Sequence, residues 1–92
     1  MANFETGLRD YLEGKERLNA NERRLLRVLD LPKNNKRRQR VLRQVELAAS
    51  NKLQEDGVRL GASFDWGSID WESLLASIMK LIQMIISLFG GL

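Results

Sequence analysis

The chain has 92 residues, with 15 Lys and Arg against 12 Asp and Glu, and it contains neither histidine nor cysteine. Disulfides and thiolate zinc sites are therefore excluded, and the side chain best suited to proton transfer near neutral pH is missing. We expect one small domain that is not an enzyme and has no cofactor and no metal site. Because a chain of this size buries only roughly 60 to 65% of its unfolded surface, we also expect an oligomer or a larger assembly.

Apolar residues recur at helical spacing along the chain, so the sequence predicts an all-α fold. The first predicted helix covers about 3–13 and ends at Gly14. The second covers about 20–30; it begins with a capping-box-like pattern at Asn19, and it ends before Pro32, which pushes the preceding residue out of helical dihedral angles. Both helices are short and amphipathic.

The third and fourth predicted helices are longer. The third covers about 35–55, is amphipathic, and is followed by Gly57. The fourth is the hydrophobic C-terminal helix, over about 69–89. Asp70 and Glu72 lie in its first turn, where negative side chains complement the helix dipole, and this explains them more simply than a magnesium site does.

Charge divides this single small domain into two unlike parts. We predict a basic helical region over 1–57, an irregular linker over 58–67 and the hydrophobic helix within 68–92. Residues 15–43 carry a net charge of +8, whereas residues 53–92 carry −3. The two parts are therefore expected to contact different partners.

Six cations lie within eleven residues of the basic region, with no acidic residue among them: Lys33, Lys36, Arg37, Arg38, Arg40 and Arg43. On a helix that begins near residue 35, three of them share one face at i, i+4 and i+7, and Arg37 and Arg38 flank that face. Such a cluster favours a polyanion. The phosphates of a nucleic acid, anionic lipid headgroups and the acidic surface of a protein partner all suit it, and a solvated helix face is the remaining interpretation.

The second and third helices also suggest a helix-turn-helix. However, their connection contains a proline instead of the usual glycine-containing turn, and only Gln39 and Gln44 are suited to reading base edges there. We therefore expect phosphate contacts more than sequence reading. A nucleic-acid-binding regulator that oligomerises through its C-terminal helix is kept as an alternative.

The C-terminal helix is apolar except for a narrow polar stripe that contains Lys80. Its candidate membrane or assembly residues are Trp71, Leu74, Leu75, Ile78, Leu81, Ile82, Ile85, Ile86 and Phe89. Its length of roughly 31 Å is enough to cross a bilayer core, but a lysine near its centre makes a lone spanning helix marginal. Burial against protein, association with a membrane and lining of a lytic pore all stay open.

Together these features predict a non-enzymatic structural or binding protein. Small size, polarised charge and an apolar helix left over from the core suit a minor structural protein of a phage or virus particle, and a membrane-active, holin-like or lytic protein is an alternative. The first 20 residues lack the apolar segment of a secretory signal. We therefore expect a virion or membrane-associated location, or otherwise the cytoplasm.

Overall fold

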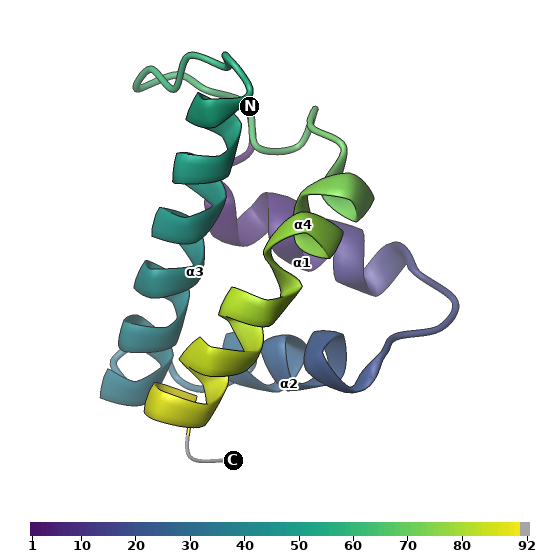
Figure 1. Cartoon of the computed structure of the whole chain (residues 1–92). Coiled ribbons are helices and arrows are strands. Elements are labelled where there is room, and N and C mark those ends of the chain that lie inside the picture. Colours follow the sequence, from purple (N-terminus) through teal and green to yellow (C-terminus); the bar gives the residue numbers. More distant parts are fainter. Residues whose placement is uncertain (91–92) are drawn as a thin grey trace.

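The computed structural model describes residues 1–90, which form four α-helices and a closing π-helical turn, without a strand in this range (Figure 1). The elements are α1 (Phe4–Gly14), α2 (Ala20–Leu29), α3 (Lys36–Glu55), α4 (Trp71–Ile85) and η1 (Ile86–Gly90). The predicted all-α fold is confirmed, with helix bounds within a residue or two for the first three helices. The fourth helix begins two residues later than expected, and its last turn widens into η1.

Each α-helix begins where a side chain can satisfy its unpaired backbone N–H groups. Asn19 and Glu22 form a capping box at α2: the Asn19 side chain accepts from the Glu22 N–H at 2.8 Å, and the Glu22 carboxylate accepts from the Asn19 N–H at 3.0 Å. The other three helices have Asn or Asp caps: Asn3, Asn35 and Asp70. Beyond the end of α3, Gly57 adopts a φ of 86°. A residue with a side chain would be strained in this backbone conformation.

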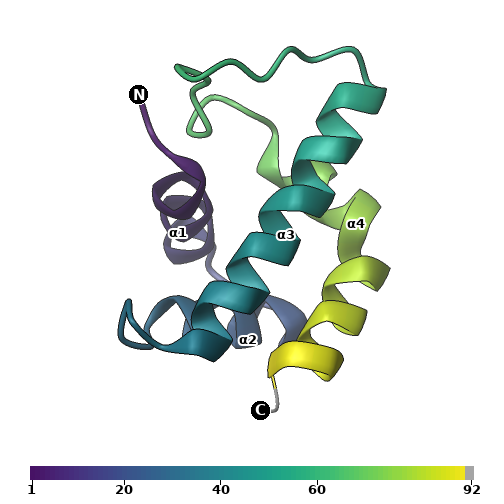
Figure 2. The same cartoon turned by 90° about the vertical axis from the view of Figure 1, so that its left-hand side faces the viewer.

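The hydrophobic core lies between all four helices. Its most deeply buried side chains are Leu8, Leu12, Leu25, Val28, Val41, Val45, Leu75 and Ile82. The helices α3 and α4 run in opposite directions, and the η1 turn packs against α3 (Figures 1 and 2). The apolar C-terminal helix is therefore a part of the core and not an appendage to it.

Five aromatic side chains hold the start of α4 against α1. Trp66 lies between Phe4 and Phe64, with ring centroids 5.1 and 5.0 Å away in edge-on geometry, and Trp71 stacks on Tyr11 at 6.3 Å. The backbone of the segment before α4 is fixed as well, because the Trp66 N–H donates to the Ala2 carbonyl oxygen at 3.0 Å. This segment is irregular, and Phe64 and Trp66 anchor it to the core.

Gly7 is the point of closest approach between α1 and this segment. A Cβ atom at Gly7 would lie 2.5 Å from the Trp66 carbonyl oxygen and 2.9 Å from its carbonyl carbon. We expect Gly7→Ala to lower the free energy of unfolding by about 2 kcal/mol, because backbone has to move to make room. Urea denaturation, with circular dichroism as the probe of unfolding, measures this loss.

Gly14 provides the matched control, because a Cβ atom there would meet nothing within 4 Å. Gly14→Ala is expected to leave stability unchanged or to raise it slightly, since alanine favours helix. Equal denaturation midpoints for the two variants would show that the contact of α1 with Trp66 is not tight.

Candidate functional site

Five of the six clustered cations form one exposed surface. We call this surface the basic ridge; it consists of Lys33, Lys36, Arg37, Arg40 and Arg43. All but Lys33 lie in the first half of α3, whose apolar residues face the core and leave the cations outside. Within residues 1–90 no ridge side chain makes an ion pair within 4 Å. The ridge therefore keeps its positive charge available to a partner.

Arg38, the sixth cation, points inward and has a structural role. Its guanidinium donates to both carboxylate oxygens of Glu5, at 3.2 and 2.8 Å, and to the Leu29 carbonyl oxygen at 3.3 Å. It thus joins α1, the end of α2 and α3, and its side chain is only 6% exposed. The spacing was a usable signal, because residue 38 lies on the same helical stripe as Val41 and Val45.

The two candidate base readers are placed less favourably than the ridge. The Gln39 amide donates to the Lys33 carbonyl oxygen at 3.2 Å, and Gln44 is half-buried. Neither side chain projects freely as a reader of base edges would.

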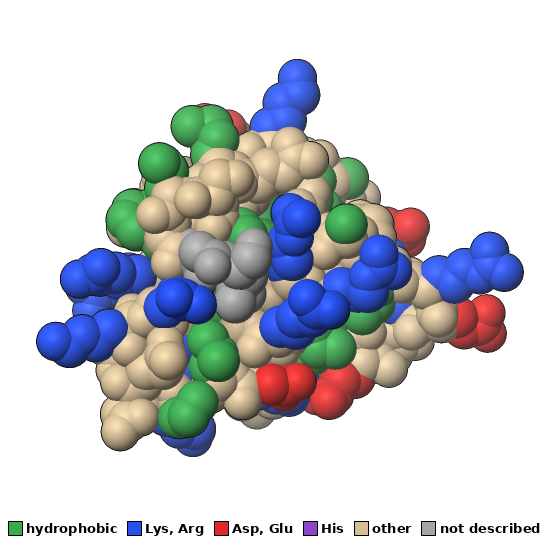
Figure 3. All heavy atoms as spheres, turned by 90° about the horizontal axis from the view of Figure 1, so that it is seen from below, with side chains coloured by type: hydrophobic (Ala, Val, Ile, Leu, Met, Phe, Trp, Pro, Cys, Tyr) green, Lys and Arg blue, Asp and Glu red, His purple; other side chains and the backbone are tan. Residues whose placement is uncertain are grey.

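More cations lie at the same end of the molecule. Arg23, Arg24 and Arg27 are exposed on α2, which passes near the start of α3 at the lower end of the fold (Figure 1). Seen from below, Lys and Arg side chains are spread across this face, with hydrophobic side chains between them (Figure 3). This end of the molecule is therefore both strongly basic and partly apolar.

The nine candidate residues of the C-terminal helix divide between two environments. Six are buried in the core: Trp71, Leu74, Leu75, Ile78, Ile82 and Ile86. Ile85 is half-buried, and Leu81 and Phe89 are exposed. Residues 71–89 are long and apolar enough to cross a membrane, with 28% of the most apolar stretch buried, which is weak evidence for a span. One face of this helix is therefore buried against the rest of the protein.

The outward side of α4 and η1 carries an exposed apolar strip, of which only Leu81 is among the nine candidate residues. We call it the outer stripe; it consists of Leu81, Met84 and Leu88, which are 47%, 57% and 72% exposed. Spacings of three and four residues place them on one side of the helix. Periodicity alone does not separate this stripe from the buried face, because Leu74 lies seven residues before Leu81, on nearly the same side of the helix, and is buried.

The basic ridge and the end of α4 meet. A hollow of about 350 Å³ is lined by α3 residues and by Phe89 of η1: Lys36, Gln39, Arg40, Arg43, Gln44 and Phe89. A second hollow, of about 530 Å³, lies along the outer side of the C-terminal helix and includes Lys80, Met84 and Leu88. Cationic and apolar groups thus border one another at this end of the fold.

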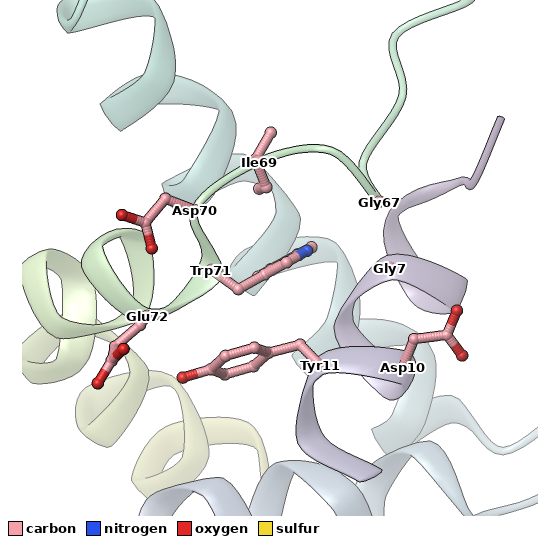
Figure 4. A pocket seen from close by; sticks show the side chains of 8 residues that line it. All are labelled: Gly7, Asp10, Tyr11, Gly67, Ile69, Asp70, Trp71 and Glu72. Carbon is pink, nitrogen blue, oxygen red and sulfur yellow. The ribbon is translucent and has the colours of Figure 1, made fainter. Parts of the chain in front are cut away.

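A separate cleft of about 430 Å³ lies between α1 and the start of α4 (Figure 4). The stacked rings of Tyr11 and Trp71 form its wall, and the carboxylate of Asp10 points to the opposite side from those of Asp70 and Glu72. Asp70 caps α4, and the hydrogen bond from the Ser73 N–H lowers the pKa of its carboxyl group. Among the described residues no three acidic side chains converge as metal ligands would.

Comparison of the chain with family models, with curated proteins and with solved structures gives no match.

Proposed function

We propose that the protein is a non-enzymatic binding protein that docks its basic ridge on a phosphate-bearing polyanion. The observation that carries the proposal is the ridge itself, in which five exposed cations are grouped at one end of the fold and lack ion pairs within residues 1–90. Grouped like charges repel one another in the free protein, and a polyanion removes that repulsion.

The size of the ridge sets the expected salt dependence. Five phosphate contacts give a slope of about −4.5 in a plot of log affinity against log salt concentration for duplex DNA. Raising the salt from about 50 to 200 mM should therefore weaken binding to a duplex by more than roughly a hundredfold. If the ridge were only a solvated helix face, the protein would show no binding to the duplex at either salt concentration.

Sequence-specific recognition of DNA has less support than binding to phosphates. Arg38 is engaged with Glu5, and the Gln39 amide is engaged with the backbone of Lys33. The five ridge side chains are long cations, which suit phosphate oxygens in any sequence. A structural role in a phage or virus particle stays a prediction of the sequence.

Charge reversal tests the proposal. We expect Arg40→Glu combined with Arg43→Glu to weaken binding more than tenfold, both to a fluorescent 20-base-pair duplex and to vesicles that contain phosphatidylserine. The matched control is Arg17→Glu combined with Arg59→Glu, which changes the net charge equally at exposed residues outside the ridge. Equal losses for both pairs, or no binding to either probe at low salt, would refute the proposal.

A further inference from the structure

The basic ridge borders an exposed apolar side chain, Phe89, and charge alone does not account for this junction. Phe89 lines one hollow together with Lys36, Arg40 and Arg43, and its side chain is 39% exposed. The outer stripe lies on the same C-terminal segment: Leu88 directly precedes Phe89, and Met84 and Leu88 line a second hollow together with Lys80. A partner that covers the whole surface must offer negative charge and an apolar layer side by side.

An anionic lipid bilayer has this arrangement, with phosphates at the surface and acyl chains directly beneath them. The phosphate backbone of a nucleic acid matches the ridge but leaves the exposed side chains of Met84 and Leu88 in water. Two exposed leucines and a methionine on one side of a helix are typical of a surface that enters the boundary between headgroups and acyl chains.

We infer that this protein is a peripheral membrane protein that docks on anionic lipid through the outer stripe, Phe89 and the basic ridge. The inference rests on the proposed function, since it names the polyanion that the ridge contacts. The helix α4 keeps its place in the fold during docking and lies against the bilayer without crossing it. Its inward side chains, among them Leu75 and Ile82, remain in the core.

The position of Lys80 agrees with a docked helix. Lys80 is exposed and lines the same hollow as Met84 and Leu88. In a docked helix its ammonium group reaches the lipid phosphates while its alkyl chain covers apolar surface. In a spanning helix the same charge would lie near the bilayer centre, which is costly.

Flotation with vesicles tests the inference on the full-length protein. We expect binding to vesicles with 30% phosphatidylserine, and at least tenfold weaker binding to vesicles of phosphatidylcholine alone, because each cation near an anionic surface contributes roughly a fivefold factor. Met84→Ser combined with Leu88→Ser should weaken binding to the anionic vesicles at least tenfold and leave duplex binding unchanged. Both side chains are exposed, so circular dichroism of the variant should match that of the unchanged protein.

Leu47→Ser is the matched control for the outer stripe. Leu47 is a 53% exposed leucine on α3, and it is not among the residues that line the two hollows. Its replacement should leave vesicle binding within about twofold of the unchanged protein. A loss as large as that of the stripe variant would overturn the assignment of the docking face.

The two tryptophans distinguish docking from insertion. Trp71 begins α4, roughly 20 Å along the helix from η1 at 1.5 Å per residue, and Trp66 lies in the segment before it. A docked protein should keep its tryptophan emission when vesicles with brominated acyl chains are added, whereas a Phe89→Trp variant should gain a component that these lipids quench. Quenching of the native tryptophans, or release of trapped dye, would overturn docking in favour of insertion or a pore.

The remaining outcomes are also decisive. Binding to the duplex without binding to anionic vesicles would refute the lipid inference and leave the proposed function intact. Binding to neither probe would refute both. A concentration-dependent dimer in sedimentation, abolished by the stripe variant and accompanied by no vesicle binding, would replace the lipid with a second copy of this chain.

Discussion

Replacing Trp71 by alanine is expected to lower the free energy of unfolding by about 4 kcal/mol, the largest loss for any single side chain considered for this protein. The indole is 5% exposed, contacts the rings of Phe4, Tyr11 and Trp66, and begins the helix that closes the core. A domain of this size is stable by roughly 5 to 14 kcal/mol, so the variant should be largely unfolded under mild denaturing conditions. Urea denaturation by circular dichroism measures the loss.

Trp71→Phe separates packing from hydrogen bonding at the same position. The Trp71 indole N–H donates to the Trp66 carbonyl oxygen at 2.7 Å in a buried setting. Phenylalanine keeps an aromatic ring but leaves that oxygen without its partner, at a cost of about 1 to 2 kcal/mol. If the alanine and phenylalanine variants lose the same stability, the ring contacts contribute little, and the account of the aromatic cluster is wrong.

Periodicity was enough to predict the four helices, because each carries an apolar stripe and a capping residue that act locally. Asn19 and Asn35 illustrate this, since their side chains accept from backbone N–H groups three residues ahead. At the fourth helix the prediction placed Asp70 inside the first turn, whereas Asp70 is the cap itself, because the helix begins two residues later than expected. The boundary at Ile86 escaped prediction, because the widening of the helix into a π-turn leaves no mark in a pattern of apolar residues.

The exposure of the candidate residues was predicted only in part, and the errors lie in which way side chains point. Arg38 was grouped with the exposed cations by its neighbours in sequence, although its partner Glu5 is 33 positions away and is brought close only by the fold. The outer stripe was hidden for a similar reason. Leu74 and Met84 are both apolar, and only the packing of α4 against the other helices decides that one is buried and the other exposed.

Coverage of α4 by the other helices also bears on the expected oligomer. The inward face of α4 is buried by the other helices of the same chain. The outer stripe and Phe89 are therefore the apolar surface that is left for a second copy at this end. A patch of a few side chains is within what a soluble monomer exposes. The oligomer therefore stays a prediction, now confined to that surface.

Removal of Glu5 is expected to cost about 3 kcal/mol at pH 7, because the buried guanidinium of Arg38 then lacks its counter-charge. This is the lower end of the range for buried ion pairs, since the Glu5 side chain is 44% exposed and part of the interaction is screened. The change is Glu5→Ala, and the measurement is the free energy of unfolding in urea at several pH values.

The pH dependence identifies the ion pair as the cause. Hydrogen bonds from Arg38 lower the pKa of the Glu5 carboxyl from its ordinary value of 4.5. A carboxyl whose pKa is lowered by folding stabilises the protein above its unfolded pKa, and this contribution is lost as the pH falls through the folded pKa. The difference between the unchanged protein and Glu5→Ala should therefore be constant above pH 6 and shrink below pH 4.5. A difference that stays the same down to pH 3 would assign the loss to packing.

Glu46→Ala is the matched control. Glu46 lines the same hollow as Glu5 and Arg38, but the pKa of its carboxyl group is shifted in the opposite direction from that of Glu5. Burial, and then the charge of Glu5, raise the pKa of the Glu46 carboxyl above its ordinary value, so the folded protein disfavours this charge. Its removal should leave stability at pH 7 within about 0.5 kcal/mol or raise it slightly, as expected for a side chain outside an ion-pair network. If Glu46→Ala costs as much as Glu5→Ala, negative charge near Arg38 stabilises the fold without regard to geometry, and the two hydrogen bonds to Glu5 are not what holds α1 to α3.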